Sequence, residues 1–150
     1  SVRWLLIGVV GGLIATGLKI PLTMAYQALF GTASGPQDSW SELSTGGVGP
    51  IIIAFVCLGV ATPIGEELFF RGVITSALLR YGPVVGVVGS AVIFAVLHGT
   101  SVVIVSALVV GLMAAELRRR SGSIWPAVVL HIVFDLVSSV GLFLVIPAAG

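Results

Sequence analysis

The sequence predicts an all-α membrane protein, a polytopic bundle of about five transmembrane helices. Of the 150 residues, 57% are hydrophobic and 9% are charged, and the mean hydropathy is +1.20. A soluble domain carries about 25% charged residues, and a small domain leaves a large share of its surface exposed. A chain of this length cannot hide so much apolar surface in its own core, so we expect lipid to cover the rest.

The predicted helices are apolar stretches that approach the ~20 residues a helix needs to cross a bilayer core of ~30 Å. Residues 31–50 separate the first two helices, and their Gly, Pro, Ser and Asp content predicts an irregular polar loop. The third helix is short, so we expect the turn at 98–101 to lie inside the bundle. The expected helices cover residues 2–29, 51–80 with a kink at Pro63, 83–98, 101–117 and 123–146, the last capped by "SGS" with Pro126 in its first turn.

The charges at the predicted helix ends indicate an orientation. Arg3, Arg80 and the run Arg118–Arg120 lie at ends that would share one side of the membrane, and the loop 31–50 carries acidic residues. Because positively charged helix ends favour the cytoplasmic side, we expect a cytoplasmic N-terminus and an extracytoplasmic loop. Glu116 lies beside the arginine run and is expected to pair with it.

Several classes of protein are disfavoured by the composition. The net charge of +1 and the lack of a basic domain give no sign of nucleic-acid binding. Cys57 is the single cysteine, which excludes an internal disulfide and a multi-cysteine zinc site, and we expect it to be a small buried hydrophobe. The first apolar stretch is too long for a cleavable signal peptide. Because the chain starts at Ser1 instead of Met, we expect a processed or trimmed fragment.

Six ionisable side chains are expected at membrane depth. A charge at mid-bilayer costs at least ~2.5–3.5 kcal/mol on insertion scales, so six such groups are expected to solvate one another in a shared polar pocket. The bundle therefore should contain a site built from the acids, bases and guanidinium of Glu66, Glu67, Arg71, His98, His131 and Asp135.

Helix geometry assigns different roles to these side chains. Glu67 and Arg71 are four residues apart and can pair on one helix face. Glu66 is rotated by ~100° from Glu67, so it is free to act as a general base or acid. His131 and Asp135 are also four apart, and we expect that carboxylate to fix the imidazole tautomer.

A glutamate base with two histidines and a further acid suits hydrolysis by activated water. The sequence has no HExxH motif and no GxSxG turn, which disfavours the soluble zinc-protease helix and a serine nucleophile.

Three segments, "EELFFR" (66–71), "FAVLH" (94–98) and "HIVFD" (131–135), match the motifs EExxxR, FxxxH and HxxxN/D in order and spacing. In this respect residues 50–146 resemble the CPBP family of intramembrane proteases. That family includes CAAX-prenyl endopeptidases, which trim prenylated C-termini, and bacterial relatives linked to bacteriocin self-immunity. The resemblance implies that residues 1–50 form an N-terminal transmembrane helix and loop, and that residues 51–150 form the catalytic helix-bundle core.

The resemblance also implies roles for the site residues. Glu66 would be the catalytic base with Glu67 as its partner, and Arg71 would form a structural ion pair. His98 would hold water or a metal, and His131 with Asp135 would complete the site. A divalent metal such as zinc on His98 and His131, with Glu66 or Asp135, and a metal-free water activated by glutamate are both compatible with it. Where the family has Asn, Asp135 can donate a hydrogen bond only when protonated, which favours a cation ligand.

Three functions remain open at this point. The first is an intramembrane endopeptidase that cleaves near the C-terminus or in membrane-proximal segments of a peptide or membrane-protein substrate. The second is a non-catalytic bacteriocin-immunity or scaffold protein, and the third is an ion or proton pathway. The expected location is a prokaryotic cell membrane, with the lipid bilayer as a partner. Family members have more helices, so N-terminal helices are expected to be missing.

Overall fold

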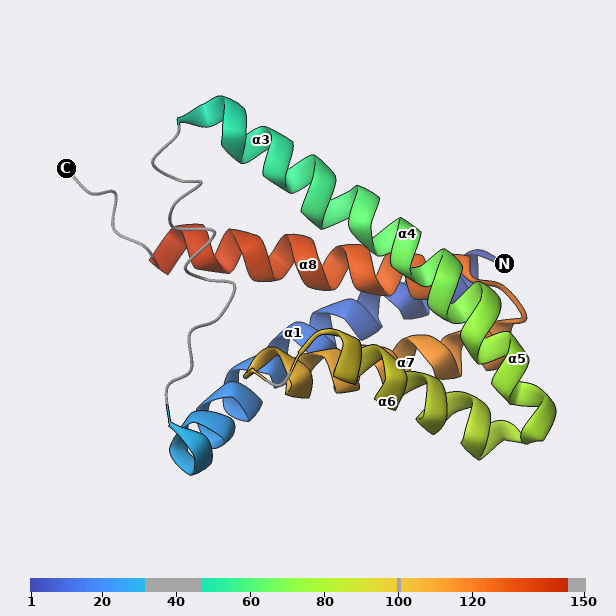
Figure 1. Cartoon of the computed structure of the whole chain (residues 1–150). Coiled ribbons are helices and arrows are strands. Elements are labelled where there is room, and N and C mark those ends of the chain that lie inside the picture. Colours follow the sequence, from blue (N-terminus) through green and yellow to red (C-terminus); the bar gives the residue numbers. More distant parts are fainter. Residues whose placement is uncertain (32–46, 100, 146–150) are drawn as a thin grey trace.

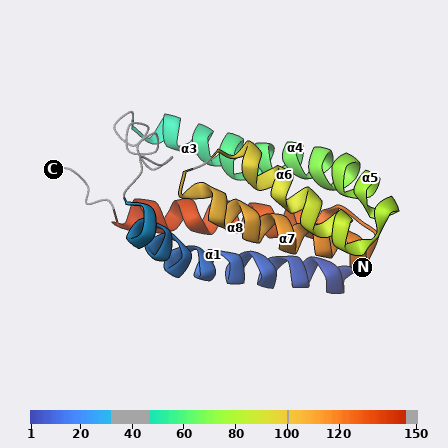
Figure 2. The same cartoon turned by 60° about the horizontal axis from the view of Figure 1, so that its bottom comes forward.

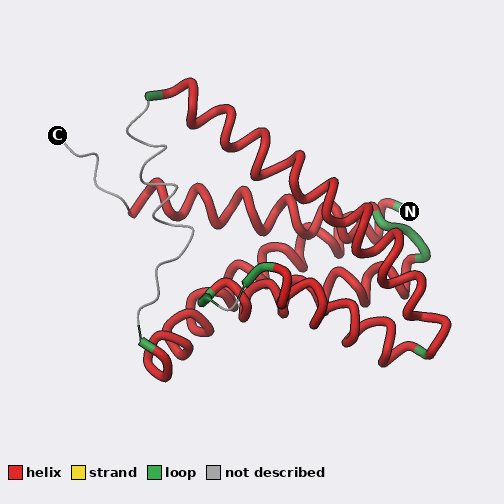
Figure 3. Tube along the Cα trace, viewed as in Figure 1, coloured by secondary structure: helices red, strands yellow, loops and turns green. Residues whose placement is uncertain are grey.

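The structure is a computed structural model that describes residues 1–31, 47–99 and 101–145, with side chains described up to residue 140. Every regular element in these ranges is helical, and five helical stretches follow one another along the chain (Figures 1 and 3). The all-α prediction is therefore confirmed. Most of the predicted loop at 31–50 lies outside the described residues, and residues 48–50 already belong to the second stretch.

The helix bounds lie within a few residues of the predicted ones. The first stretch is α1 (Val2–Phe30), and the last two are α7 (Val103–Ser121) and α8 (Trp125–Val145). The third stretch joins a π-helical segment, Val85–Gly89, to α6 (Ser90–Leu97). The second stretch runs without a break through α3 (Val48–Val56), a π-helical segment (Cys57–Ala61), α4 (Thr62–Phe69), a second π-helical segment (Phe70–Thr75), α5 (Ser76–Leu78) and a final 3₁₀ turn (Leu79–Tyr81).

The π-helical segments in the second stretch lie on either side of α4, which carries the paired glutamates. Pro63 is in the first turn of α4, directly after the first π-helical segment. Proline has no N–H to donate and crowds the preceding turn, and wider turns of this kind often occur at functional sites. The predicted disturbance at Pro63 thus takes the form of a π-helical segment in a continuous helix.

Two helices in the described part are long and apolar enough to cross a membrane, Val2–Phe30 and Val48–Tyr81. Two shorter apolar helices accompany them, Val85–Leu97 and Trp125–Val140. Large apolar side chains such as Leu13, Ile53 and Phe69 are exposed on the outer faces of these helices. Such surface would be unfavourable in water and is expected in lipid.

The ends of the helices sort into two groups (Figures 1 and 2). The N-terminus, the turn between α5 and α6, and the α7–α8 turn lie at one end of the bundle, whereas α1 ends and α3 begins near the other. Arg3, Arg80 and Arg118–Arg120 therefore share one end, as the orientation argument requires. In both views the end of α6 and the start of α7 lie between the two ends of α8. Residue 100 of the predicted turn at 98–101 lies outside the described residues.

Glycines bring α1 close to α8. A Cβ added at Gly8 would lie 2.5 Å from the carbonyl oxygen of Pro126, and one added at Gly12 would lie 2.6 Å from that of Leu130. These glycines are four residues apart and form the small-residue pattern that lets membrane helices approach closely. The same contacts set a register in which the two helices run in the same direction.

The prediction for Cys57 was wrong, because its side chain is exposed. The residue begins the first π-helical segment and is flanked by Val56 and Leu58, which are also exposed. Lipid is as apolar as a helix interface, so there is no force that drives a thiol inward in a membrane protein.

Replacing Gly12 by Ala should destabilise the fold, because the new methyl group meets the carbonyl oxygen of Leu130 and the branched side chain of Val133 on α8. We expect a loss of about 1–3 kcal/mol, the usual cost of overpacking, measured by thermal unfolding in detergent. Gly17→Ala is the matched control, because nothing lies within 4 Å of a Cβ added there. Equal unfolding temperatures for the two variants would contradict the α1–α8 packing.

Candidate active site

The predicted pair of Glu67 and Arg71 is present and deeply buried. Arg71 Nε lies 2.9 Å from Glu67 Oε2, and the side chains are 1% and 0% exposed. Both residues follow Pro63 on the second helical stretch, and the spacing of four residues places them on one face. The pair solvates two charges that the surrounding apolar side chains cannot.

Arg71 also contacts two other helices, α7 and α6. Its Nη2 donates to the carbonyl oxygen of Gly111 on α7 at 3.4 Å, and its guanidinium lies 4.6 Å from the centre of the Phe94 ring on α6. Cations favour such positions over aromatic faces. Gly111 packs tightly against Ala91, where an added Cβ would lie 3.1 Å from Ala91 Cα. The close α6–α7 contact thus brings both partners to one guanidinium.

The second oxygen of Glu67 holds His131. Glu67 Oε1 lies 2.9 Å from His131 Nδ1, across 64 residues of sequence. A carboxylate can only accept, so Nδ1 carries the hydrogen and Nε2 is left free. We had expected Asp135 to fix this tautomer, but its Oδ2 lies 3.8 Å from Nε2, too far for a hydrogen bond. That expectation is corrected: Glu67 orients His131, because it reaches Nδ1 from the neighbouring helix.

His98 also carries its hydrogen on Nδ1, and its partner there is a carbonyl of its own helix. Its Nδ1 lies 2.8 Å from the carbonyl oxygen of Phe94, one turn earlier. A carbonyl also only accepts, so Nδ1–H donates and Nε2 is free. The Phe94 ring packs against both imidazoles, with centroids 4.2 Å from His98 and 5.7 Å from His131. Phe94 is 1% exposed, and its ring is thus shared by the two histidines and Arg71.

The free Nε2 atoms of both histidines face one oxygen of Glu66. Glu66 Oε2 lies 3.6 Å from His98 Nε2 and 3.9 Å from His131 Nε2. All three atoms are acceptors when the imidazoles are neutral, and the separations exceed direct hydrogen bonds. A water molecule between these atoms would donate to two of them.

The side chains of the site differ in their exposed fractions. The side chains of Glu66, His98 and Asp135 are each about one quarter exposed, at 27%, 26% and 27%. Glu67 and Arg71 are fully buried behind them. The structure therefore brings all six predicted residues together and leaves Glu66, His98 and Asp135 partly exposed, whereas the side chain of His131 is 7% exposed.

The types and positions of these side chains show whether they could hold a metal ion. Two imidazole nitrogens and two carboxylates are the ligand types that zinc uses. In the described ranges, however, no three His, Cys, Asp or Glu side chains are gathered so that they could hold a metal ion. These positions do not match a preformed metal centre, and we derive no step through a metal.

Sequence reasoning missed Lys19 on α1. Its ammonium lies 5.6 Å from the centre of the Phe134 ring, and its charge interacts with that of Asp135. The signal was available, because Lys19 is the only charged residue of α1 besides Arg3. The sequence analysis does not count it among the groups at membrane depth.

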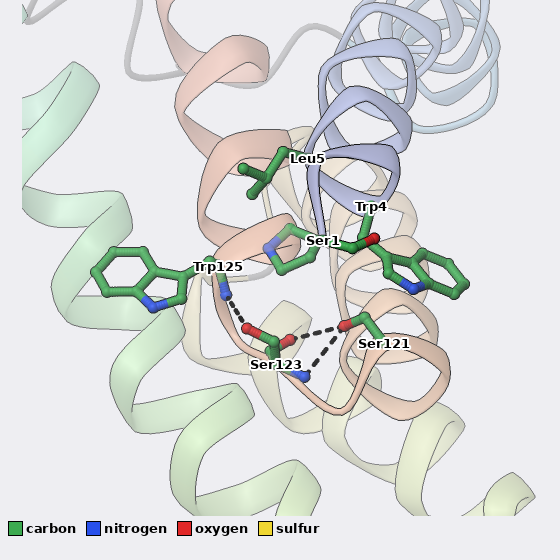
Figure 4. A pocket seen from close by; sticks show the side chains of 7 residues that line it. Ser1, Trp4, Leu5, Ser121, Ser123 and Trp125 are labelled. Carbon is green, nitrogen blue, oxygen red and sulfur yellow. Dashed lines mark hydrogen bonds between the residues drawn. The ribbon is translucent and has the colours of Figure 1, made fainter.

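A pocket at the arginine-bearing end is separate from this site (Figure 4). It is lined by residues of α1, the α7–α8 turn and the start of α8, and none of the six predicted residues contributes to it. Its serines serve the turn: Ser121 Oγ donates to the carbonyl oxygen of Ser123, and Ser123 Oγ accepts from the Trp125 N–H at 3.4 Å. The last contact is the predicted use of "SGS" before α8.

Comparison with protein-family models assigns residues 47–137 to one family, described as type II CAAX prenyl endopeptidase Rce1-like. The match covers more than half of the chain. The chain belongs to the Rce1-like family. No curated protein and no solved structure gave a significant match. The Rce1-like segment contains all six site residues and begins just before α3, so α1 lies outside it.

Membership of the Rce1-like family confirms the resemblance inferred from the three motifs and, with the apolar helices, identifies a membrane protein of the CAAX-protease type. The motifs correspond to physical parts of the site. The first supplies Glu66 with the pair Glu67–Arg71, the second places Phe94 and His98 one turn apart, and the third supplies His131 and Asp135.

Replacing Arg71 by Met should strongly destabilise the protein, because it leaves the Glu67 carboxylate buried without a cation. Breaking a buried pair from one side costs about 3–5 kcal/mol. The double variant Glu67→Gln with Arg71→Met removes both charges and should recover part of this loss. Unfolding in detergent measures both, and a single variant as stable as the double one would show that the pair is not needed.

Proposed function

We propose that the protein is an intramembrane endopeptidase in which Glu66 activates a water molecule held by His98 and His131. The observation that supports this most directly is the convergence of three acceptor atoms, Glu66 Oε2 and the two Nε2 atoms, at 3.6 and 3.9 Å. Membership of a protease family is consistent with it. Neither an immunity role nor an ion pathway is favoured by a specific feature of the structure.

Hydrolysis would begin with Glu66 taking a proton from the water. The oxygen of the water attacks the carbonyl carbon of the scissile peptide bond and forms a tetrahedral oxyanion. Glu66 then gives the same proton to the leaving nitrogen, and the C–N bond breaks to release an amine and a new carboxylic acid, which loses its remaining proton to water. A positioned group that first accepts and then donates one proton is the usual form of general acid–base catalysis.

The two histidines would have different roles in this reaction. One water has two hydrogens for three acceptors, so a further proton on one imidazole is needed to satisfy the group. We assign it to His131, which lies 2.9 Å from the carboxylate of Glu67 and 3.8 Å from that of Asp135. A protonated His131 Nε2–H would donate to the oxyanion, whereas a neutral His98 would orient the water.

Asp135 fits this scheme in its ionised form. The carboxylate has no proton with which to bind an oxyanion, but it lies close enough to His131 to favour an imidazolium. This assigns to Asp135 a role that the amide found here in the wider family could not play. Asp135 thus acts through His131 as a positioning residue.

We propose a substrate whose scissile bond lies near a C-terminus or in a membrane-proximal segment. The Rce1-like description refers to an endopeptidase of prenylated CAAX ends. The exposed fractions of Glu66 and His98, about one quarter each, suit a peptide that enters from the side or end of the bundle. We propose that the arginine-bearing end faces the cytoplasm of a prokaryotic cell.

Glu66→Gln should abolish peptide cleavage while leaving the fold intact, because an amide cannot take a proton from water. We expect the rate to fall by about 10²–10⁴-fold, measured with a fluorogenic peptide in detergent or nanodiscs. Glu116→Gln is the matched control, because Glu116 pairs with Arg119 at the helix end, away from the site. A Glu66→Gln variant that cleaves as fast as the control would rule out this mechanism.

A chelator should leave the activity unchanged if the water is activated without a metal, as the spacing of the ligand set favours. The measurement combines metal analysis of the purified protein with cleavage assays before and after dialysis against the chelator. Stoichiometric zinc together with activity that chelation removes and zinc restores would contradict the metal-free form and support the ligand set of His98 and His131.

A further inference from the structure

We propose that Lys19 on α1 binds the C-terminal carboxylate of the peptide substrate. This inference rests on the proposed peptidase function and names the part of the substrate that is recognised. It begins from a cation that the reaction scheme above does not use, in a helix that lies outside the segment matched by the family.

The register of α1 against α8 places Lys19 beside the site. Gly8 faces Pro126 and Gly12 faces Leu130, so each turn of α1 meets the corresponding turn of α8. One further turn brings α1 to the level of Phe134 and Asp135. Helical side chains lean toward the N-terminus of their helix, so Lys19 reaches back to the Phe134 ring at 5.6 Å.

The ammonium has unused binding capacity. In the described part of the chain it makes no hydrogen bond and no close ion pair; its contacts are the Phe134 ring and a longer-range interaction with Asp135. A lysine ammonium carries three donors, and a half-buried cation in a membrane helix is a candidate functional group. An anion that enters the site would find a partner there.

Distance and charge favour a terminal carboxylate over other anions. His131 and Asp135 are one helical turn apart, ~5.4 Å along α8, and Lys19 lies over the ring of Phe134, the neighbour of Asp135. An extended peptide covers ~3.3–3.6 Å per residue. A carboxylate bound by Lys19 would therefore place a bond a few residues from the terminus near Glu66, without requiring a specific side chain.

The test uses two fluorogenic peptides of identical apolar sequence, one with a free C-terminal carboxylate and one with a C-terminal carboxamide. We expect the wild-type protein to show a KM at least several-fold lower for the carboxylate, with a similar kcat. Lys19→Gln should lose this difference, and Lys19→Arg should keep most of it. Arg3→Gln removes the other cation of α1, at the end of the helix, and should leave the difference unchanged.

Each remaining outcome contradicts a defined part of the proposal. If the wild-type protein cleaves both peptides with one KM, or if Lys19→Gln keeps the difference, Lys19 does not bind the carboxylate, and the proposed function stands. If Lys19→Gln slows both peptides equally, Lys19 only balances Asp135. If anionic lipid in nanodiscs competes with substrate in the wild-type protein and not in Lys19→Gln, the cation binds lipid phosphate. If neither peptide nor a wider peptide set is cleaved, the proposed function itself fails.

Lys19→Met serves as a second variant in case the glutamine variant does not fold. Methionine resembles the apolar stem of lysine in length and shape and lacks the ammonium group. It should unfold at the temperature of the wild-type protein and show the same loss of preference for the carboxylate. A folded Lys19→Met protein that still prefers the carboxylate would overturn the proposal.

Discussion

The buried carboxylate of Glu67 is the interaction on which the rest of the site depends. One oxygen holds Arg71 at 2.9 Å and the other holds His131 at 2.9 Å. Through Arg71 it reaches the carbonyl of Gly111 on α7 and the ring of Phe94 on α6. An unpaired charge inside a bilayer is costly, so these contacts must form together or not at all. One carboxylate thus ties the second helical stretch to α6, α7 and α8.

Two adjacent glutamates can have opposite roles because a helix turns by ~100° per residue. Glu67 points into the bundle and is fully buried, whereas Glu66 is 27% exposed and faces two imidazole nitrogens. The supporting residue also sets the state of the reactive group, because its hydrogen bond leaves His131 Nε2 directed toward Glu66. The ring of His131 therefore connects the buried Glu67 to Glu66. A change that moves Glu67 should disturb both the packing of the helices and the position of His131 Nε2.

Local spacing in the sequence predicted the helices and the Glu67–Arg71 pair, because helical periodicity acts over a few residues. The gathering of six polar residues was predicted from the free-energy cost of a charge in the membrane, which depends on composition. The contact of Glu67 with His131 spans 64 residues and depends on how helices pack, which spacing does not specify. For the same reason, the sequence analysis assigns the orientation of the His131 imidazole to Asp135 instead of Glu67, and expects Cys57 to be buried. Lys19 was overlooked because its relevance follows only from the register of α1 against α8.

In the proposed mechanism, Glu66, His98 and His131 hold one water molecule between them. An experimental structure at a resolution that shows ordered water tests this directly. We predict a single density within about 2.7–3.2 Å of Glu66 Oε2 and of both Nε2 atoms, the range of hydrogen bonds. A density about 2.0–2.1 Å from the nitrogens would instead indicate zinc. A direct contact between Glu66 and either imidazole, with no density between the three groups, would contradict the claim.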